Sequence, residues 1–202
     1  MIQFSHPEPD NIEELVALWH LSLGADWPLT QQLLRQTMQH DPYYEREGCF
    51  IARDETRGDG EKIVGWVLSK TMKNAGPEVG RFQGRGGIGA LCVHPDYRRQ
   101  GIASALLDRA ESHLTGNGIA PCTLYYPHHL LPGIPIECHA AITLFKRRGY
   151  GEWKECVDLK RDLTDYQIPA KARAAIENNP TVELRPARED CLLYTSPSPR
   201  DS

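Results

Sequence analysis

The sequence lacks the features that mark secreted and membrane-spanning chains. No apolar run approaches the roughly 20 residues that a membrane helix needs. The residues after Met1 show no basic stretch followed by an apolar core, so no secretory signal is expected. Six cysteines are present, but none forms a C-x-x-C pair and several lie in apolar runs. We therefore expect reduced, mostly buried thiols in a soluble cytoplasmic protein, without a disulfide framework or zinc site.

A strong charge of either sign is also absent. The formal net charge is −4, which argues against a general nucleic-acid binder because such a protein needs a large basic face. The eight histidines show no metal-ligand spacing, so no metal is expected. With 202 residues, 40% of them hydrophobic, the chain can bury one sizeable domain.

Hydrophobic periodicity predicts alternating strands and helices. The expected strands span residues 2–4, 49–52, 63–68, 88–93, 122–126 and 150–159. A first helix is capped by Asp10 or Asn11 and ends at Gly24, and a second carries Pro28 in its first turn and continues to Met38. Further helices are expected at about 100–115, with Ile102, Leu106, Leu107, Ala110 and Leu114 along one side, and at 137–148 and 171–176.

The most informative stretch joins the strand that ends at Val93 to the helix that begins near Gln100. A His-Pro turn and a basic loop separate the two, and the loop contains Gly101. The first N–H groups of a helix lack partners within the helix, and the helix dipole adds roughly half a positive charge there. Gly101 permits close approach of a ligand and backbone angles that a side chain would forbid. This order of elements predicts an anion site that fits a pyrophosphate.

The pattern Arg98-x-x-Gly101-x-Ala103 resembles the acyl-CoA-binding motif of the GNAT N-acetyltransferases. The resemblance extends to the preceding Leu91-Cys92-Val93-His94-Pro95 and to a second segment, Ala141–Tyr150. The element order over residues 1–163 also matches that fold. It implies an α/β protein with a mixed, mostly antiparallel central sheet, splayed parallel strands and flanking helices. An ordinary strand-to-helix turn with a glycine at its corner is the alternative.

The resemblance also implies a cofactor, a site and a reaction. The co-substrate is acetyl-CoA, and the main chain of Leu91, Cys92 and Val93 pairs with its pantetheine arm. Its pyrophosphate lies on the loop and first helical turn, formed by Arg98, Arg99, Gln100, Gly101, Ile102, Ala103 and Ser104. The implied enzyme transfers an acetyl group directly to a primary amine in a ternary complex. The acceptor is a small-molecule amine or a peptide amine.

The sequence departs from the family pattern where catalytic groups are expected. Phe145 stands where many members carry a tyrosine that protonates the leaving thiolate, and Cys138 stands where an asparagine is frequent. Residues 85–93 contain no carboxylate, although members that use a glutamate base place it near Gly87. His128, with its neighbour His129, is then the best-placed proton acceptor. Tyr125 and Tyr126 are weaker candidates, and a structural role is the alternative for each. These departures keep a second hypothesis open, a non-catalytic acyl-CoA-binding module of a tandem GNAT protein.

A glycine-rich segment, Gly84–Gly89, matches the G-x-G-x-x-G pattern of dinucleotide-binding proteins. That fingerprint requires a strand before it and a helix after it. Here the expected strand follows the glycines. We interpret them as part of a hairpin loop and a strand edge.

The composition changes after residue 164. We expect an N-acetyltransferase domain at 1–164, a linker at 165–180 and the start of a second GNAT domain at 181–190, with a C-terminal tail as the alternative. Residues 191–196 are what TGT CTC TTA TAC ACA TCT encodes, a frame of a common transposon-end sequencing adapter, and the following residues continue it. We interpret 191–202 as a non-native tail and exclude it from the functional argument.

Overall fold

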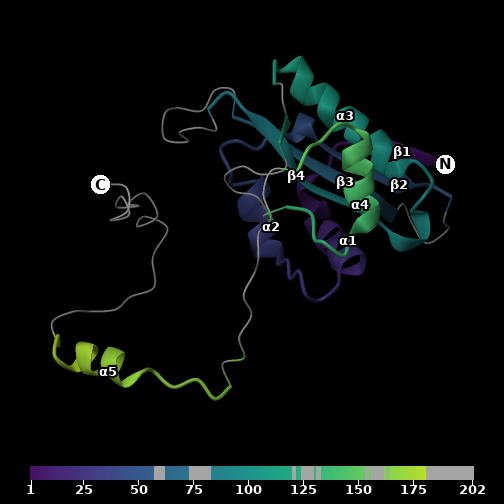
Figure 1. Ribbon diagram of the computed structural model, residues 1–202. Coiled ribbons are helices and arrows are strands. Elements are labelled where there is room, and N and C mark those ends of the chain that lie inside the picture. Colours follow the sequence, from purple (N-terminus) through teal and green to yellow (C-terminus); the bar gives the residue numbers. More distant parts are fainter. Residues whose placement is uncertain are drawn as a thin grey trace. The chain divides into compact units, whose positions relative to one another are not determined.

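The computed structural model describes residues 1–56, 62–72, 83–119, 122–123, 130, 133–152, 155, 162 and 164–180. The chain divides into two compact units, Met1–Cys156 and Val157–Ser202. In the second unit, α5 (Ala170–Glu177) has no buried residue. The first unit contains the sheet and the other helices (Figure 1).

Within the described residues, strands pair into one sheet in the order β1-β2-β3-β4-β5. Their bounds are β1 Ile2–Ser5, β2 Cys49–Asp54, β3 Lys62–Thr71, β4 Gly86–Val93 and β5 Cys122–Thr123. The first four strands are antiparallel, and β5 runs parallel to β4 with Gly86 opposite Cys122 and Gly87 opposite Thr123. This confirms the predicted mixed, mostly antiparallel sheet. The rest of the strand expected at 122–126 lies outside the described residues.

The helices of this unit are α1 Ile12–Leu23, α2 Gln31–Met38, α3 Ile102–Gly116 and α4 His139–Arg147, with short 3-10 helices η1 Pro9–Asn11, η2 Arg46–Gly48 and η4 Pro95–Tyr97. Gly24 ends α1 at a φ of 82°, as predicted. The placement of Pro28 in the first turn of the second helix is wrong. That helix begins at Gln31, because the Thr30 hydroxyl accepts a hydrogen bond from the N–H of Leu33 at 3.1 Å and caps the helix.

Two apolar layers cover the two faces of the sheet. One contains α1 and α2 and includes Trp19, Leu34 and Trp66. The other contains α3 and part of α4, and includes Leu106, Leu107 and Phe145. Figure 1 shows α1 and α2 on one side of the strands and α3 on the other. The buried side of α3 consists of the five apolar residues that its periodicity predicts.

Candidate functional site

The turn that follows β4 is built by a buried histidine. The N–H of His94 donates to the carbonyl of Val64 at 2.8 Å and so extends the pairing with β3. Its Nδ1 accepts from the N–H of Asp96 at 3.2 Å, and its carbonyl accepts from the N–H of Tyr97 at 2.9 Å. His94 therefore caps η4 and directs the chain from the strand to the loop before α3.

A carboxylate on β2 fixes the far end of this turn. The Tyr97 hydroxyl donates to Oδ2 of Asp54 at 2.7 Å, and the hydroxyl and N–H of Thr56 donate to Oδ1 of Asp54 at 2.7 and 3.0 Å. Hydrogen bonds from Tyr97 and then Thr56 hold the pKa of Asp54 well below its usual range. Sequence reasoning missed Asp54, because no local pattern connects it with residue 97.

The residues predicted to form the anion site, 98–104 and here called the cradle, lie where the loop enters α3. Arg99 has a φ of 64° and Gly101 a φ of 83°, two left-handed residues that reverse the chain just before the helix. The N–H of Ala105 is bonded to the carbonyl of Gly101 at 3.0 Å, so the N–H groups of residues 101–104 precede the first bond of the helical ladder. Nothing lies within 4 Å of a Cβ built on Gly101, which leaves the approach open.

The side chains of the cradle have separate tasks. The side chain of Ile102, the first residue of α3, is buried in the apolar layer against the sheet, so this residue offers only its main chain. Arg99 and Gln100 are exposed. Gln100 donates to the carbonyl of Asp96 at 3.0 Å. Ala103 and Ser104 are half-buried. The structure thus brings residues 99–104 together at one helix N-terminus.

The Arg98 side chain makes hydrogen bonds to the protein backbone. Its Nε donates to the carbonyl of Val93 at 3.3 Å, and its terminal nitrogen donates to the carbonyl of Ser22 at 3.0 Å. The Ser22 hydroxyl also donates to the Val93 carbonyl, at 3.3 Å. Arg98 therefore ties the last turn of α1 to the end of β4. The sequence analysis placed Arg98 among the residues of the implied pyrophosphate site and missed Ser22.

The pairing of β4 with β3 determines which main-chain groups of β4 face β3 and which face away from it. His94 and Val64 form a hydrogen-bonded pair, and such pairs alternate along an antiparallel ladder. The main chain of Cys92 therefore faces β3, while that of Leu91 and Val93 points toward the β5 side. Cys92 is 2% exposed, and burial raises the pKa of its thiol. Of the three predicted edge residues, two direct their backbone groups outward.

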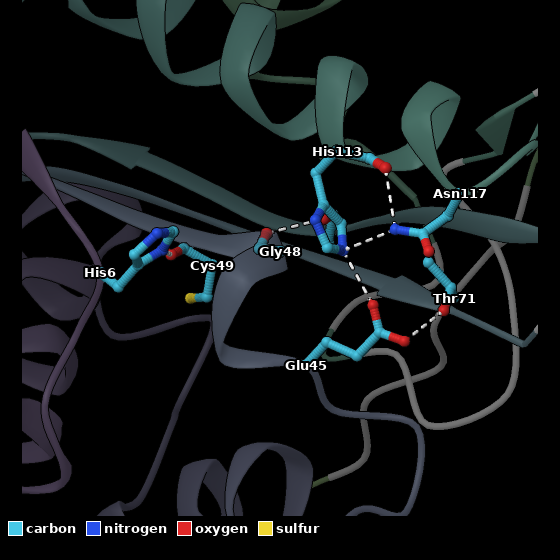
Figure 2. A network of polar contacts seen from close by, with 8 residues as sticks. His6, Glu45, Gly48, Cys49, Thr71, His113 and Asn117 are labelled. Carbon is cyan, nitrogen blue, oxygen red and sulfur yellow. Dashed lines mark hydrogen bonds and ion pairs between the residues drawn. The ribbon is translucent and has the colours of Figure 1, made fainter.

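Side-chain contacts toward both ends of α3 hold the helix against the strands and the segment before β2. A Cβ on Gly65 would lie 3.0 Å from Ile102 Cγ2 and 3.1 Å from Leu106 Cδ1, so a larger residue there would require the side chains of the first turns of α3 to shift. Toward the other end, His113 Nε2 and Glu45 Oε2 lie 2.8 Å apart, and Thr71 donates to Glu45 Oε1 at 2.9 Å. Figure 2 shows this network, with Glu45 between His113 and Thr71.

The second predicted segment packs α4 against α3. Phe145 is 5% exposed and meets Tyr150 edge to face, with ring centroids 5.0 Å apart. The Tyr150 hydroxyl donates to Glu111 at 3.1 Å, and Arg148 binds Asp108 at 2.7 Å as well as Glu111. Carboxylates on α3 thus anchor the end of α4. Phe145 is a core residue.

Residues 12–127 match the model of the acetyltransferase (GNAT) family. The chain belongs to this family. An acetyltransferase from Yersinia pestis (strain Pestoides F) is 34% identical over 113 residues, which is 55% of this chain. The chain spans 66% of the length of that relative.

Solved structures give the same fold. The Escherichia coli ribosomal-protein-S18-alanine N-acetyltransferase superposes with a TM-score of 0.55 at 16% identity, covering 76% of this chain and 80% of that one. A GCN5-related glucosamine N-acetyltransferase region of a fungal multi-domain β-N-acetylglucosaminidase gives 0.60 at 24% identity, covering 89% of this chain and 20% of that one. At these identities the likeness shows the fold alone.

Two positions bear on catalysis in this GNAT domain, His128 and the strand near Gly87. His128 lies outside the described residues. Near Gly87, where the sequence provides no carboxylate on β4, the residue opposite on β3 is Lys70. Gly86 begins a strand, as expected for the glycine-rich segment, and no helix follows it directly.

In the described ranges no helix is long and apolar enough to cross a membrane. The same ranges contain no group of three or more His, Cys, Asp or Glu side chains that could hold a metal.

Proposed function

We propose that this domain transfers the acetyl group of acetyl-CoA directly to a primary amine in a ternary complex. The observation that carries the proposal is the open N-terminus of α3, reached through two left-handed residues directly after a strand edge. A pyrophosphate there would accept from main-chain N–H groups aligned with the helix dipole. The proposed cofactor residues are Leu91, Cys92, Val93, Arg98, Arg99, Gln100, Gly101, Ile102, Ala103 and Ser104.

The pantetheine arm would lie along the outward-facing edge of β4, as an added strand pairs with a sheet. Leu91 and the N–H of Val93 would supply the backbone partners, because the Val93 carbonyl already accepts from Arg98 and Ser22. Cys92, whose main chain faces β3, would support the edge through its buried side chain. Arg98 would keep the edge and the cradle in register by holding the Val93 carbonyl. This arrangement is supported by the alternation of hydrogen bonds between β3 and β4.

The chemistry then requires few protein groups. The amine nitrogen attacks the thioester carbonyl carbon, a C–N bond forms, the C–S bond breaks, and CoA leaves as a thiolate that takes a proton. Holding both reactants in one complex supplies much of the rate. His128 is the proposed acceptor of the proton that the amine loses, directly or through water. The acceptor is a small-molecule or peptide amine, and a cytoplasmic location is proposed with it.

The test measures CoA release by the full chain with three amines: glucosamine, a peptide with N-terminal alanine, and spermidine. The first two follow the named substrates of the structurally similar enzymes. Release that depends on one of them supports the proposal. Gly101→Glu should abolish acetyl-CoA binding in calorimetry, because it places bulk and negative charge against the pyrophosphate. Unchanged affinity in this variant would refute the assigned cradle.

A second function, acyl-CoA binding without turnover, is favoured by one specific observation. Phe145 is buried in the layer beneath α3 and carries no proton for the leaving thiolate. A domain of this kind would serve as one half of a tandem GNAT protein. Tight acetyl-CoA binding without CoA release for any amine would favour this function over the first.

A further inference from the structure

An ion pair between β3 and the turn that follows α2 is completely buried. Nζ of Lys70 on β3 binds Oδ2 of Asp41, and the two side chains are 0% and 1% exposed. Burial lowers the pKa of Lys70, and the contact with Asp41 opposes that change. Opposite charges removed from water this completely are frequently no more stabilising than apolar residues of the same volume. A contribution to stability is therefore a weak explanation for the pair.

The position of Lys70 in the sheet places the pair beside the point where β4 meets β5. Lys70 lies opposite Gly87 of β4, which lies opposite Thr123 of β5, so the three form one row across the sheet. Trp66 and Leu68, which alternate with Lys70 along β3, belong to the apolar layer of α1 and α2. The ion pair therefore lies on the α1–α2 face of this row, opposite the face that α3 covers.

The same row marks the end of the proposed cofactor edge. A pantetheine arm that pairs with Leu91 and Val93 runs along β4 away from the cradle, toward Gly87. At Gly86 and Gly87 the edge is occupied by β5, because these residues pair with Cys122 and Thr123. The arm must therefore end before this row. Its thioester would lie beside the Lys70–Gly87–Thr123 row.

Asp41 also shapes the turn that follows α2. Its Oδ1 accepts from the N–H of Tyr43 at 2.8 Å, and its carbonyl accepts from the N–H of Tyr44 at 3.1 Å. Both tyrosines are half-buried, and Tyr44 packs against the α1–α2 layer. One carboxylate thus folds the turn through Oδ1 and fastens it to β3 through Oδ2.

We propose that Asp41 and Lys70 are a positioning pair, which holds the Asp41–Tyr44 turn beside the row as a wall of the acceptor site. The inference rests on the proposed acetyl transfer, because the acceptor must reach the thioester at this row. Neither side chain is exposed, so the pair acts through the turn and does not touch the reacting atoms. Losing the charges while keeping the shape should then disturb the acceptor and spare acetyl-CoA.

The test compares the wild type with the double variant Asp41→Asn/Lys70→Met. Asparagine retains an oxygen for the Tyr43 N–H, and methionine approximates the length of lysine, so no charge is left unpaired. The control, Glu8→Gln/Arg46→Met, removes an ion pair whose side chains are 64% and 45% exposed. Three quantities are measured: the melting temperature, the calorimetric Kd for acetyl-CoA, and KM and kcat for the amine of the panel that the wild type acetylates.

The double variant should keep its acetyl-CoA Kd within about twofold and raise the acceptor KM about tenfold or more, because a small misplacement of a reactant is costly. Hydrogen–deuterium exchange at residues 41–45 should become faster, and exchange in α3 should stay unchanged. The control also loses the hydrogen bond from Arg46 Nε to the Pro7 carbonyl, so it should match the wild type in acetyl-CoA Kd and acceptor KM. An unchanged acceptor KM, or a Kd that weakens by the same factor as KM, overturns the proposal.

Two further results complete the test. If the wild type releases no CoA with any amine, the proposed function fails. In that case the positioning role of Asp41 and Lys70 is tested by hydrogen–deuterium exchange alone, and unchanged exchange at residues 41–45 in the double variant overturns it. If the double variant does not fold, Asp41→Glu and Lys70→Arg keep both charges. Asp41→Glu lengthens the support of the turn and should raise the acceptor KM, whereas Lys70→Arg should stay closer to the wild type. Wild-type kinetics in Asp41→Glu would overturn the proposal.

Discussion

Tyr97 and Asp54 are joined by a hydrogen bond of 2.7 Å although they lie 43 positions apart in the sequence. The bond connects the turn before the cradle to the end of β2. In the sheet, β3 lies between β2 and β4, so β2 does not pair with the strand that leads into the loop. The geometry of the loop therefore depends on a strand that is not adjacent to β4. The turn before the cradle is therefore held by Asp54 on β2 as well as by the residues next to it in the chain.

We predict that Tyr97→Phe lowers the melting temperature by a few degrees at pH 7 and makes the protein less dependent on pH under acidic conditions. The pKa of Asp54 is lowered in the folded state, so its contribution to stability is present above its unfolded pKa of about 4 and is lost as the pH falls toward the folded value. The difference between wild type and variant should therefore be largest near neutral pH and shrink below about pH 4.

The control for this prediction is Tyr150→Phe, which removes a hydroxyl bonded to Glu111 on α3 at 3.1 Å. Thermal unfolding of the three proteins is followed between neutral and acidic pH. A gap between wild type and Tyr97→Phe that stays constant over this range would contradict the assignment of the acid-sensitive contribution to Asp54.

The second prediction concerns Gly101 and uses Gly118 as a matched control. The two glycines lie at opposite ends of α3, have φ values of 83° and 75°, and have nothing within 4 Å of an added Cβ. Alanine at either position should cost about 1–2 kcal/mol of stability through left-handed strain alone. Only Gly101→Ala should also weaken acetyl-CoA binding in calorimetry. Equal affinities in the two variants would separate Gly101 from the cofactor site.

The sequence was sufficient for the elements whose signals are local. The five buried residues of α3 follow from helical spacing, and the left-handed Gly101 follows from its place before that helix. Thr30 instead of Pro28 defines the start of α2, because a side-chain cap competes with the preference of proline for a first turn.

The partners of the site could not be predicted, because they are distant in sequence and individually ordinary. Asp54 has no motif around it, and the contact between Arg98 and Ser22 joins residues 76 positions apart. The pair formed by Asp41 and Lys70 requires knowledge of which face of β3 the turn after α2 packs against. Only the folded chain determines these neighbours.

The third prediction concerns the geometry of Arg98. Arg98→Lys keeps the charge, but one ammonium cannot reproduce the two directed hydrogen bonds to the carbonyls of Val93 and Ser22. Arg98→Lys and Arg98→Ala should therefore destabilise the protein to a similar extent, about 1 kcal/mol. Urea unfolding checks this expectation. A lysine variant as stable as the wild type would show that charge, not directed bonding, is the contribution.

A fourth prediction addresses the residue that differs from the family pattern. Phe145→Tyr restores the phenol but places its hydroxyl at a position that is 5% exposed and packed against Tyr150. We expect a loss of about 1–3 kcal/mol from the buried hydroxyl and no increase in kcat. A variant with higher kcat and undiminished stability would mean that the position does reach the thioester.

The last prediction tests whether the depth of α3 in the sheet controls the cradle. A Cβ at Gly65 would lie 3.0 Å from Ile102 and 3.1 Å from Leu106, and the carbonyl of Cys92 lies 3.3 Å away on the strand. Gly65→Ala should therefore push the first turns of α3 outward and cost about 1–3 kcal/mol by overpacking.

Gly48→Ala is the matched control, because its Cβ would lie 2.9 Å from Ser69 and 3.0 Å from His113, toward the other end of α3. Both variants should lose stability in thermal unfolding, but acetyl-CoA should bind more weakly to Gly65→Ala than to Gly48→Ala. Under the proposed function, the N-terminus of α3 binds the pyrophosphate where its N–H groups and the edge of β4 are in register, and the close contact at Gly65 is expected to control that register. Equal affinities would mean that the cradle tolerates a displaced helix and that the loop residues alone determine binding.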